Sequence, residues 1–290
     1  MTKFSNNNIV YSLLFISIIL FGCDKIDDPI ENKDDVPNIP EMEYDTLWST
    51  PNSSMRYILI EEFTGHTCTN CPEGAAEVQR LDSIYAPQII PVAIHAGIFA
   101  ETENNPDGSY STNFSTTEGE EYNATFAVWG YPSAMISRKK DGGNYVLPKG
   151  SWESTITNIK DDAPMVKIDV MCLYNDSVRI IKPTIYVEWL QAATGSYKLQ
   201  VFLIEDHIID WQLDGGFHNP NYEHRHSLRK TVNGTWGEPV TTSNAGDTAS
   251  FSSSYQLDAD WVSTNCQIVA FIYDASTYEV IQATEVGLAE

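Results

Sequence analysis

The chain has 290 residues, enough for two domains that each bury a hydrophobic core. It carries 17 basic and 40 acidic residues, which gives a net charge of −23. So negative a chain is expected to repel nucleic acid and anionic lipid surfaces, which excludes both as partners bound by charge. The hydrophobic fraction of 42% is ordinary for a globular protein, and the sequence predicts no cofactor.

Residues 1–22 are predicted to be a signal peptide and not part of the fold. The apolar run from Ile9 to Phe21 is too short to span a bilayer but has the length of a signal-peptide core. It leads into Leu20-Phe-Gly-Cys23, which resembles the lipobox of bacterial lipoproteins. The resemblance implies cleavage before Cys23 and a lipid anchor on that cysteine. An ordinary cleaved signal with an unmodified Cys23 is the alternative.

Residues 23–54 are predicted to be the lipidated cysteine followed by an acidic, flexible tether. Residues 24–54 hold nine acids, two lysines and four prolines. Such a segment repels itself and buries too little apolar surface to fold. The cluster Asp24-Lys-Ile-Asp-Asp28 is similar to acidic signals that send lipoproteins to the cell surface in one phylum of Gram-negative bacteria. A solvated spacer is the alternative, so the membrane leaflet stays open.

Two cysteines stand two residues apart where a predicted strand gives way to a predicted helix. The apolar run 57–63 indicates the strand, and residues 72–85 indicate the helix. A cysteine at the start of a helix meets free backbone N–H groups and the positive end of the helix dipole, which favour the thiolate. We therefore expect a solvent-exposed Cys68 to attack and a partly covered Cys71 to resolve, with the pair alternating between dithiol and disulfide.

This segment resembles the active-site segment of the thioredoxin fold. Glu62 lies six residues before Cys68, where thioredoxins carry a buried acid that handles the proton of the resolving cysteine. The segment Val128-Trp-Gly-Tyr-Pro132-Ser is similar to the loop whose cis-proline faces the cysteine pair. The resemblance implies catalytic roles for Cys68, Cys71, Glu62 and Pro132. The residues beside the cysteines depart from the thioredoxin pattern, so the redox direction stays open.

The other elements of residues 55–163 fit a single α/β domain of the thioredoxin-like class. Residues 89–95 are predicted to be a second buried parallel strand, which makes a βαβ unit with the strand and helix before it. Residues 96–115 are expected to be a long irregular insertion. The remaining expected elements are a helix at 117–126, a strand at 133–137, a hairpin turn at 141–144 and a last helix at 152–159.

From Met165 the hydrophobic pattern changes to a period of two, which is typical of half-buried strands. Residues 164–290 are therefore predicted to be an all-β C-terminal domain, an antiparallel sandwich of the immunoglobulin-like kind. Its clearest strands are expected at 166–170, 185–190, 197–204, 267–273 and 279–283.

A lipobox, a thioredoxin-like domain and a sandwich, in this order, resemble the twenty-eight-kilodalton outer membrane lipoprotein family of Gram-negative bacteria. The segment from Asn221 to Arg229 is similar to a tyrosine, histidine and Leu-Arg signature of that family's second domain. The resemblance implies an outer membrane location, on the periplasmic face or the cell surface. It also implies membrane attachment through the lipid anchor, and envelope proteins as clients or binding partners.

Two further cysteines, Cys172 and Cys266, lie on strand-like runs of the predicted sandwich. In an oxidising compartment they could form a disulfide that closes a loop of about 95 residues. Two buried, free thiols that act as small apolar side chains are the favoured alternative.

Three histidines in the second half raise the question of a metal site. His224 and His226, two apart on a predicted strand, could hold a metal together with His218. Histidines that are hydrogen-bonded within the fold are the favoured interpretation, so the sequence predicts no metal.

Two functions from different classes fit this sequence. The first is a thiol–disulfide oxidoreductase of the cell envelope that uses Cys68 and Cys71. The alternative is a non-enzymatic surface binding or assembly lipoprotein, in which the thioredoxin-like domain is a scaffold and its cysteines form a static disulfide. The fold alone does not choose between them.

Overall fold

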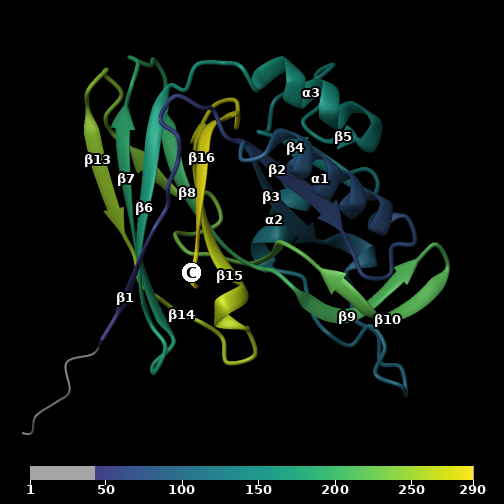
Figure 1. The fold of residues 1–290 in the computed structure, drawn as a ribbon. Helices are drawn as coiled ribbons and strands as arrows, with labels where there is room; N and C mark the ends of the chain where they lie inside the picture. The colour runs from purple at the N-terminus through teal and green to yellow at the C-terminus, as the bar shows by residue number, and fades with distance from the viewer. Residues whose placement is uncertain (1–42, 290) are drawn as a thin grey trace, which may run out of the picture. The chain divides into compact units, whose positions relative to one another are not determined.

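Three β-sheets and a few short helices make up residues 43–289, the part of the chain that the computed structural model describes (Figure 1). The predicted signal peptide 1–22, Cys23 and residues 24–42 of the predicted tether lie outside the described residues. Within residues 43–289, every helix is too short or too polar to cross a membrane.

The smaller of the two main sheets is antiparallel and runs in the order β1-β6-β7-β13, with β14 also paired to β7. Its strands are β1 (Asp45–Trp48), β6 (Val166–Asn175), β7 (Ile180–Trp189), β13 (Thr248–Ser252) and β14 (Tyr255–Gln256). Along β6, Val166, Ile168 and Val170 are buried and alternate with half-buried residues. The period-two pattern of the sequence is thus confirmed for this strand.

The larger sheet has nine strands in the order β16-β15-β8-β11-β3-β2-β4-β5, with β12 also paired to β8. Its strands are β2 (Ile58–Thr64), β3 (Ile89–His95), β4 (Ser133–Ile136), β5 (Leu147–Pro148), β8 (Tyr197–Glu205), β11 (Ser227–Thr231), β12 (Glu238–Val240), β15 (Cys266–Asp274) and β16 (Val280–Gly287). Strands β2 and β3 are parallel and buried throughout, as the sequence predicts.

This larger sheet contains strands from both predicted domains. Strand β11 pairs antiparallel with β8 and parallel with β3, where Ser227 lies opposite Ala93. The Ala93 N–H also donates to the His226 carbonyl oxygen at 2.8 Å. One face of the sheet carries a shared core in which Phe63 and Tyr122 of the first half pack with Phe202 of the second. The two halves of residues 43–289 are therefore joined by main-chain pairing and by packing.

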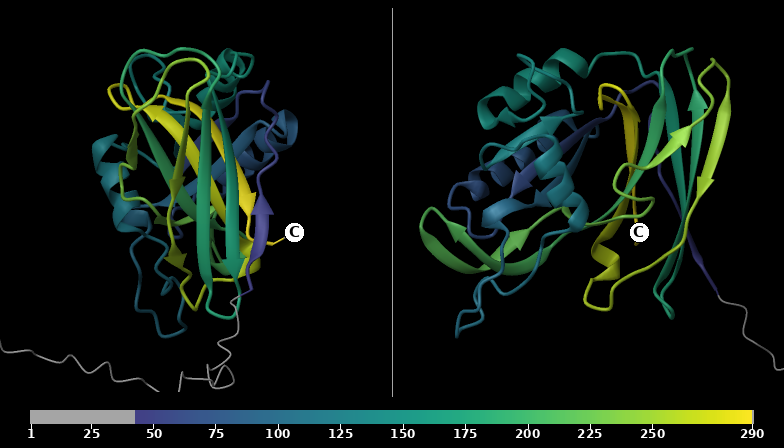
Figure 2. Two further views of the ribbon diagram at one scale, coloured as in Figure 1. Left: turned by 90° about the vertical axis from the view of Figure 1, so that its left-hand side faces the viewer. Right: turned by 180° about the vertical axis from the view of Figure 1, so that it is seen from behind.

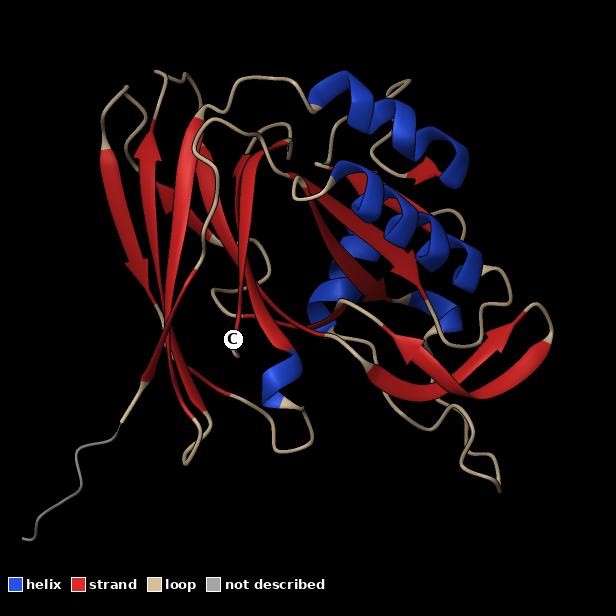
Figure 3. Cartoon of the chain, in the orientation of Figure 1, coloured by secondary structure: helices blue, strands red, loops and turns tan. Residues whose placement is uncertain are grey.

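Three α-helices cover the β2–β3 part of the sheet (Figure 3). They are α1 (Cys71–Tyr85), α2 (Thr117–Thr125) and α3 (Trp152–Ile159), with short 3-10 turns η1 (Gly97–Phe99), η2 (Lys149–Ser151) and η3 (Ser263–Asn265). Helices α1 and α3 pack on the face that carries Ile58 and Ile60. Helix α2 packs on the opposite face through Tyr122 and Phe126. The three helices expected from the sequence are confirmed.

The two main sheets face each other across a second core. Leu199 and Leu203 of β8 and Ile268 of β15 pack against Val166 and Trp189 of the smaller sheet. Because successive residues of a strand point to opposite faces, β8 and β15 serve this core with one face and the shared core with the other. The described residues are therefore mostly β-structure with several sheets.

A buried ion pair lies in the shared core. Arg138, which follows β4, donates through Nε and Nη2 to both carboxylate oxygens of Glu61 at 2.8 and 2.7 Å. The side chains of Arg138 and Glu61 are 1% and 0% exposed. The guanidinium also lies over the rings of Tyr122, Phe126 and Phe271 at 5.1–5.3 Å. Through its contact with Phe271 of β15, the guanidinium of this first-half pair therefore also touches the second half of the chain.

The predicted tether extends too far along the chain. Residues 45–48 form β1, which pairs antiparallel with β6. Leu47 is buried in the core between the sheets, and Trp48 stacks on Tyr186 at 6.1 Å. The high content of acids and prolines in 24–54 hid a short strand that an existing sheet edge stabilises. The prediction that this segment cannot fold is therefore wrong for 45–48.

Cys172 and Cys266 are free thiols in the described structure, so the disulfide between them is not formed. Each sulfur hydrogen-bonds a carbonyl oxygen of its own segment, at Leu173 for Cys172 and at Val262 for Cys266. Burial raises the pKa of both thiols to about 12, which keeps them protonated and inert. They behave as the small buried apolar residues of the favoured alternative.

Candidate functional site

The candidate site lies where the carboxyl ends of β2 and β3 meet α1. Alternate residues of each strand face the helix, so Glu62 and Thr64 continue the face that Ile58 and Ile60 begin. Parallel register places Thr64 beside His95 on the neighbouring strand. The carboxyl edge of parallel strands is a common place for ligand and catalytic groups in α/β folds.

Cys68 and Cys71 form a disulfide at this edge, with Cα atoms 5.4 Å apart. Helix α1 begins at Cys71 with Asn70 as its N-cap, so Cys68 lies in the turn before the helix. The Cys68 N–H donates to the Gly65 carbonyl oxygen, and the Cys68 carbonyl oxygen accepts from the Cys71 N–H. The helix start favours charge on the Cys71 side of the pair at least as directly as on Cys68.

A hairpin from the second half of the chain covers the disulfide turn (Figures 1 and 2). It consists of β9 (Ile208–Asp214) and β10 (Phe217–His224), paired antiparallel. The Gln212 side chain donates to the carbonyl oxygens of Gly65 and Cys68 at 3.3 and 3.0 Å. Two backbone hydrogen bonds add to these contacts. The Leu213 N–H donates to the His66 carbonyl oxygen at 2.8 Å, and the Gly215 N–H donates to the Thr69 carbonyl oxygen at 3.0 Å.

Both cysteines are buried as a result. Cys68 is 3% exposed and Cys71 is 2% exposed, whereas Thr69 and Asn70 between them are exposed. The expectation that Cys68 faces solvent is therefore wrong for this disulfide-bonded form. The cover comes from residues about 140 positions further along the chain. The local sequence around the two cysteines therefore carries no information about this cover.

Glu62 is buried beneath the first turns of α1, in line with the buried acid that the sequence resemblance implies at this position. Among residues 43–289 its side chain has no ion-pair partner, and its Oε1 atom has no hydrogen-bond partner. Burial raises the pKa of Glu62 to about 8, so the carboxyl group is mostly uncharged at neutral pH. A Cβ added to Gly74 would lie 2.4 Å from Oε1, which shows how closely the helix approaches the carboxyl group.

Pro132 also lies close to the same glycine. A Cβ added to Gly74 would also come within 2.5 Å of the Pro132 Cβ atom. The Tyr131–Pro132 peptide bond is cis, as the resemblance to the thioredoxin loop implies. The structure thus brings Pro132, Glu62 and the helix that begins at Cys71 together. With Cys68 bonded to Cys71, this region holds all four residues for which the sequence resemblance implies catalytic roles.

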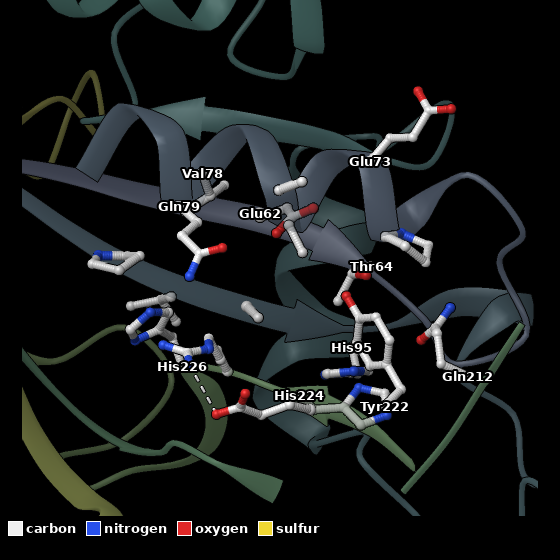
Figure 4. Close-up of a pocket in the computed structure, with 18 of the residues that line it drawn as sticks. Glu62, Thr64, Glu73, Val78, Gln79, His95, Gln212, Tyr222, His224 and His226 are labelled. Carbon is white, nitrogen blue, oxygen red and sulfur yellow. Dashed lines mark hydrogen bonds and ion pairs between the residues drawn. The ribbon is translucent and has the colours of Figure 1, made fainter. Parts of the chain in front are cut away.

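A cavity of about 470 Å³ opens beside Glu62, between α1 and the β9–β10 hairpin (Figure 4). Its wall on the side of the strands and α1 includes Glu62, Thr64 and Gln79. Gln212 and Tyr222 of the hairpin form the opposite wall. Most of a small ligand could be enclosed in a space of this size.

Four of the chain's six histidines surround two aromatic side chains, and two of these four, His95 and His224, also line the cavity. They are His66, His95, His218 and His224, around Tyr110 and Phe114. His224 hydrogen-bonds the Trp211 carbonyl oxygen through Nε2, and His218 hydrogen-bonds the Tyr110 hydroxyl through Nδ1. Burial lowers the pKa of His224 to about 4. These contacts match the favoured interpretation of hydrogen-bonded histidines, and His226 lies beyond the end of β10.

The hairpin is the part of the site that the sequence reading missed. Its turn carries a usable signal, because Asp214-Gly215-Gly216 stands between two strand-like runs. Both glycines have positive φ values, of 56° and 91°. The signal predicts a hairpin but not what the hairpin covers.

A model of the outer membrane protein Omp28 family matches residues 119–290, which is more than half of the chain. The chain belongs to the Omp28 family. This membership places the protein at the outer membrane, as the sequence resemblance implies. The matched residues include Pro132 and the whole second half but not Cys68 and Cys71, so the match does not extend to the disulfide. No curated protein matches the chain.

Among solved structures, HBP35 of Porphyromonas gingivalis is 15% identical with a TM-score of 0.60, covering 81% of this chain and 76% of its own. At this identity the similarity concerns the fold alone. A domain of the outer membrane lipoprotein Omp28 from Porphyromonas gingivalis is 26% identical with a TM-score of 0.32, covering 43% of this chain and 89% of its own. A protein from Agrobacterium tumefaciens is 15% identical with a TM-score of 0.44, and the match covers 80% of this chain and 95% of that protein. The last two scores do not establish a shared fold.

Proposed function

We propose that this Omp28-family protein is a thiol–disulfide oxidoreductase of the cell envelope that uses Cys68 and Cys71. In this proposal residues 55–163 are a thioredoxin-like domain and residues 164–290 are a β-sandwich domain joined to it by the large sheet. The observation that carries the proposal is Glu62, an acid without an ion-pair partner in the described part of the chain, buried under the helix that begins at Cys71.

Glu62 has an energetic cost that a static disulfide does not explain. A buried carboxyl group with a pKa of about 8 must take up a proton that the unfolded chain does not bind at neutral pH. The shift corresponds to about 3 kcal/mol of lost stability at pH 7. A purely structural disulfide gains nothing from such a neighbour, whereas proton transfer to a cysteine requires one.

The chemistry follows from the oxidised pair and the protonated acid. A client thiolate attacks the Cys68 sulfur, the Cys68–Cys71 bond breaks, and Cys71 leaves as a thiolate. Protonated Glu62 gives its proton to Cys71. The second client thiolate then attacks the client sulfur of the mixed disulfide and releases Cys68. Two electrons have passed from the client dithiol to the cysteine pair, and in the reverse sequence the reduced pair passes them to a client disulfide, which oxidises the pair again.

Burial of both sulfurs is the observation that favours the second candidate function, a binding or assembly lipoprotein with a static disulfide. The two candidates differ in what happens when Cys71 is absent. If the pair is catalytic, Cys68 of the Cys71→Ala variant attacks a client disulfide in the reverse sequence, and no Cys71 thiol is present to release it. We expect this variant to accumulate mixed disulfides with envelope proteins, and Cys68→Ala to accumulate none, on non-reducing gels with mass spectrometry.

The reduction potential of the pair provides the deciding control. A catalytic pair is expected to exchange with glutathione and to have a reduction potential above about −300 mV. Structural disulfides typically have reduction potentials below that value. The oxidoreductase proposal is wrong, and the scaffold function replaces it, if two results are found together. The pair stays oxidised until the potential falls below about −300 mV, and the Cys71→Ala variant traps no protein.

Access to the disulfide in this proposal requires the β9–β10 hairpin to move away. Gln212→Ala removes the side-chain bonds to Gly65 and Cys68, each worth about 1 kcal/mol. We expect dithiothreitol to reduce the variant about tenfold faster than the wild type, because the open form is more populated. Asn219→Ala is the matched control, since Asn219 bonds only within the hairpin, at the Asn221 N–H. Equal rates for all three proteins would show that the hairpin does not gate the disulfide.

The membrane attachment proposed here is a lipid on Cys23, supported by the sequence Leu20-Phe-Gly-Cys23. The mass of the amino-terminal peptide from membrane-bound protein tests it, because an unmodified peptide that begins after Cys23 contradicts the anchor.

A further inference from the structure

The cavity beside Glu62 has the size and setting of a ligand site. At about 470 Å³ it falls within the range of small-molecule pockets. It lies at the carboxyl ends of the parallel strands β2 and β3, between two separate parts of the chain (Figure 4). Val78, Pro91 and Val92 give it an apolar wall next to its polar groups.

Two deeply buried polar groups that line the cavity each have an atom without a hydrogen-bond partner among residues 43–289. Glu62 is 4% exposed and His95 is 3% exposed. Neither the Oε1 atom of Glu62 nor the Nδ1 atom of His95 makes a hydrogen bond. Unpaired buried polar atoms are costly and uncommon, so these two need an explanation beyond packing.

The charges around the cavity favour a cationic ligand. Asp214 on the hairpin wall has no ion-pair partner among residues 43–289. Arg225, the single lysine or arginine that lines the cavity, is bound by Glu223 at 2.9 Å. At the helix wall Glu73 is paired with Lys149 at 2.7 Å. Glu62 and Asp214 are thus acids without a cation, and an anionic ligand would meet repulsion.

The histidines of the cavity do not supply the missing cation. Burial lowers the pKa of His95, His224 and His226, so all three rings are neutral at physiological pH. A metal ion does not fit either, because no three His, Cys, Asp or Glu side chains of the described residues are grouped to hold one. The remaining choice is an organic cation.

We propose that this cavity binds an ammonium group on an alkyl stem, held by the Glu62 carboxylate, the His95 imidazole and the Tyr222 ring. The three N–H donors of an ammonium match acceptors on Glu62, His95 and Thr64, and the stem packs on the apolar wall. The Tyr222 ring lines the same space and offers a cation–π contact. A free alkylamine and a lysine side chain share this chemistry. The inference does not depend on thiol exchange.

Binding is linked to the proton of Glu62. The ammonium pairs with the ionised carboxylate, so the ligand must displace the proton below a pH of about 8. We expect the affinity for an amine to be roughly 50-fold lower at pH 6 than at pH 8, with about one proton released per amine at pH 6. The amine itself stays charged across this range.

The experiment is isothermal titration calorimetry of the oxidised full-length protein with n-butylamine and with n-butanol, its uncharged counterpart. Two buffers of different ionisation enthalpy count the protons released. The expected result is binding of the amine, no measurable binding of the alcohol and the pH dependence given above. A third titrant, N-acetyl-lysine N-methylamide, separates the sources, because it binds only if the site accepts a lysine side chain.

Two variants and a control make the test specific. Glu62→Gln should lower the amine affinity at least tenfold at pH 8, and Asp214→Asn severalfold, because each removes one of the unpaired charges. Glu285→Gln is the control: burial also raises the pKa of Glu285, to about 7, but Glu285 does not line the cavity. It should leave the affinity unchanged.

Three results would overturn the proposal: equal affinity for butanol and butylamine, no binding of either, or full affinity in Glu62→Gln. Repeating the titration with Cys68→Ser/Cys71→Ser keeps it separate from the redox function. Amine binding by this double variant supports the cavity whatever the disulfide does. Should the double variant fail to fold, the oxidised wild-type protein still decides the matter.

Discussion

Arg138→Met is expected to lower the free energy of unfolding by about 3–5 kcal/mol, the largest single effect we predict for this chain. The substitution keeps most of the side-chain volume but leaves the Glu61 carboxyl group buried, without its cation and without its two hydrogen bonds. Burial of an uncompensated charge costs far more than the pair itself contributes. Urea unfolding followed by tryptophan fluorescence measures the loss.

Two comparisons separate this effect from the loss of an ordinary ion pair. Arg80→Met removes an arginine that bonds Glu77 and Glu153 at the surface, and should change stability very little. The double variant Arg138→Met/Glu61→Met removes both buried charges and should recover much of the stability lost in the single variant. The account is wrong if Arg138→Met is no more harmful than Arg80→Met.

Glu62→Gln should make the protein more stable, and increasingly so as the pH rises. The folded state holds the Glu62 proton up to a pH of about 8, whereas the unfolded state releases it near the ordinary pKa of 4.5. Wild-type stability is therefore lost as the pH rises from 4.5 to 8, and glutamine, which does not titrate, avoids this loss. The expected gain is about 3 kcal/mol at pH 7 and close to zero at pH 4.5.

The comparison rests on the difference between variant and wild type at each pH, measured by urea unfolding. The buried histidines titrate in both proteins, so their effect cancels. Glu73→Gln, at an exposed acid of the same helix, should show no such pH-dependent gain. The opposite sign is expected for activity: Glu62→Gln should slow reduction of the disulfide by a dithiol client, because Cys71 loses its proton donor. A pH-independent difference would mean that Glu62 is already ionised in the folded protein.

Local patterns in the sequence predict the elements that position the site. The run of apolar residues before Cys68 is β2, and the helix-forming residues after Cys71 are α1. Glu62 could be placed because it lies six residues before Cys68, as the buried acid does in the thioredoxin segment that this stretch resembles. Pro132 could be placed because its loop resembles the cis-proline loop of the thioredoxin fold. These inferences depend on neighbours within a few residues of each other.

What the sequence did not reveal depends on distant neighbours. The sequence led us to expect an exposed Cys68, because Gln212, which covers it, lies more than a hundred positions away. The strand β1 was missed because Asp45 and its acidic neighbours suggest a tether, whereas the edge of β6 supplies the missing hydrogen bonds. The Arg138–Glu61 pair was missed because charged residues are usually exposed, and only the assembled core shows where both lie.

The single sheet shared by the two halves determines when this chain can finish folding. Strand β3 gains its second neighbour only when β11 is present, and Arg56 and Ser137 of the first half bond the main chain of Val280 in β16. Contacts so distant in sequence are slow to form, and a chain that emerges from its amino terminus exposes the edge of β3 and the shared core until the last strand arrives. Residues 55–163 made alone would keep these surfaces bare, so the protein is best produced and engineered as one unit.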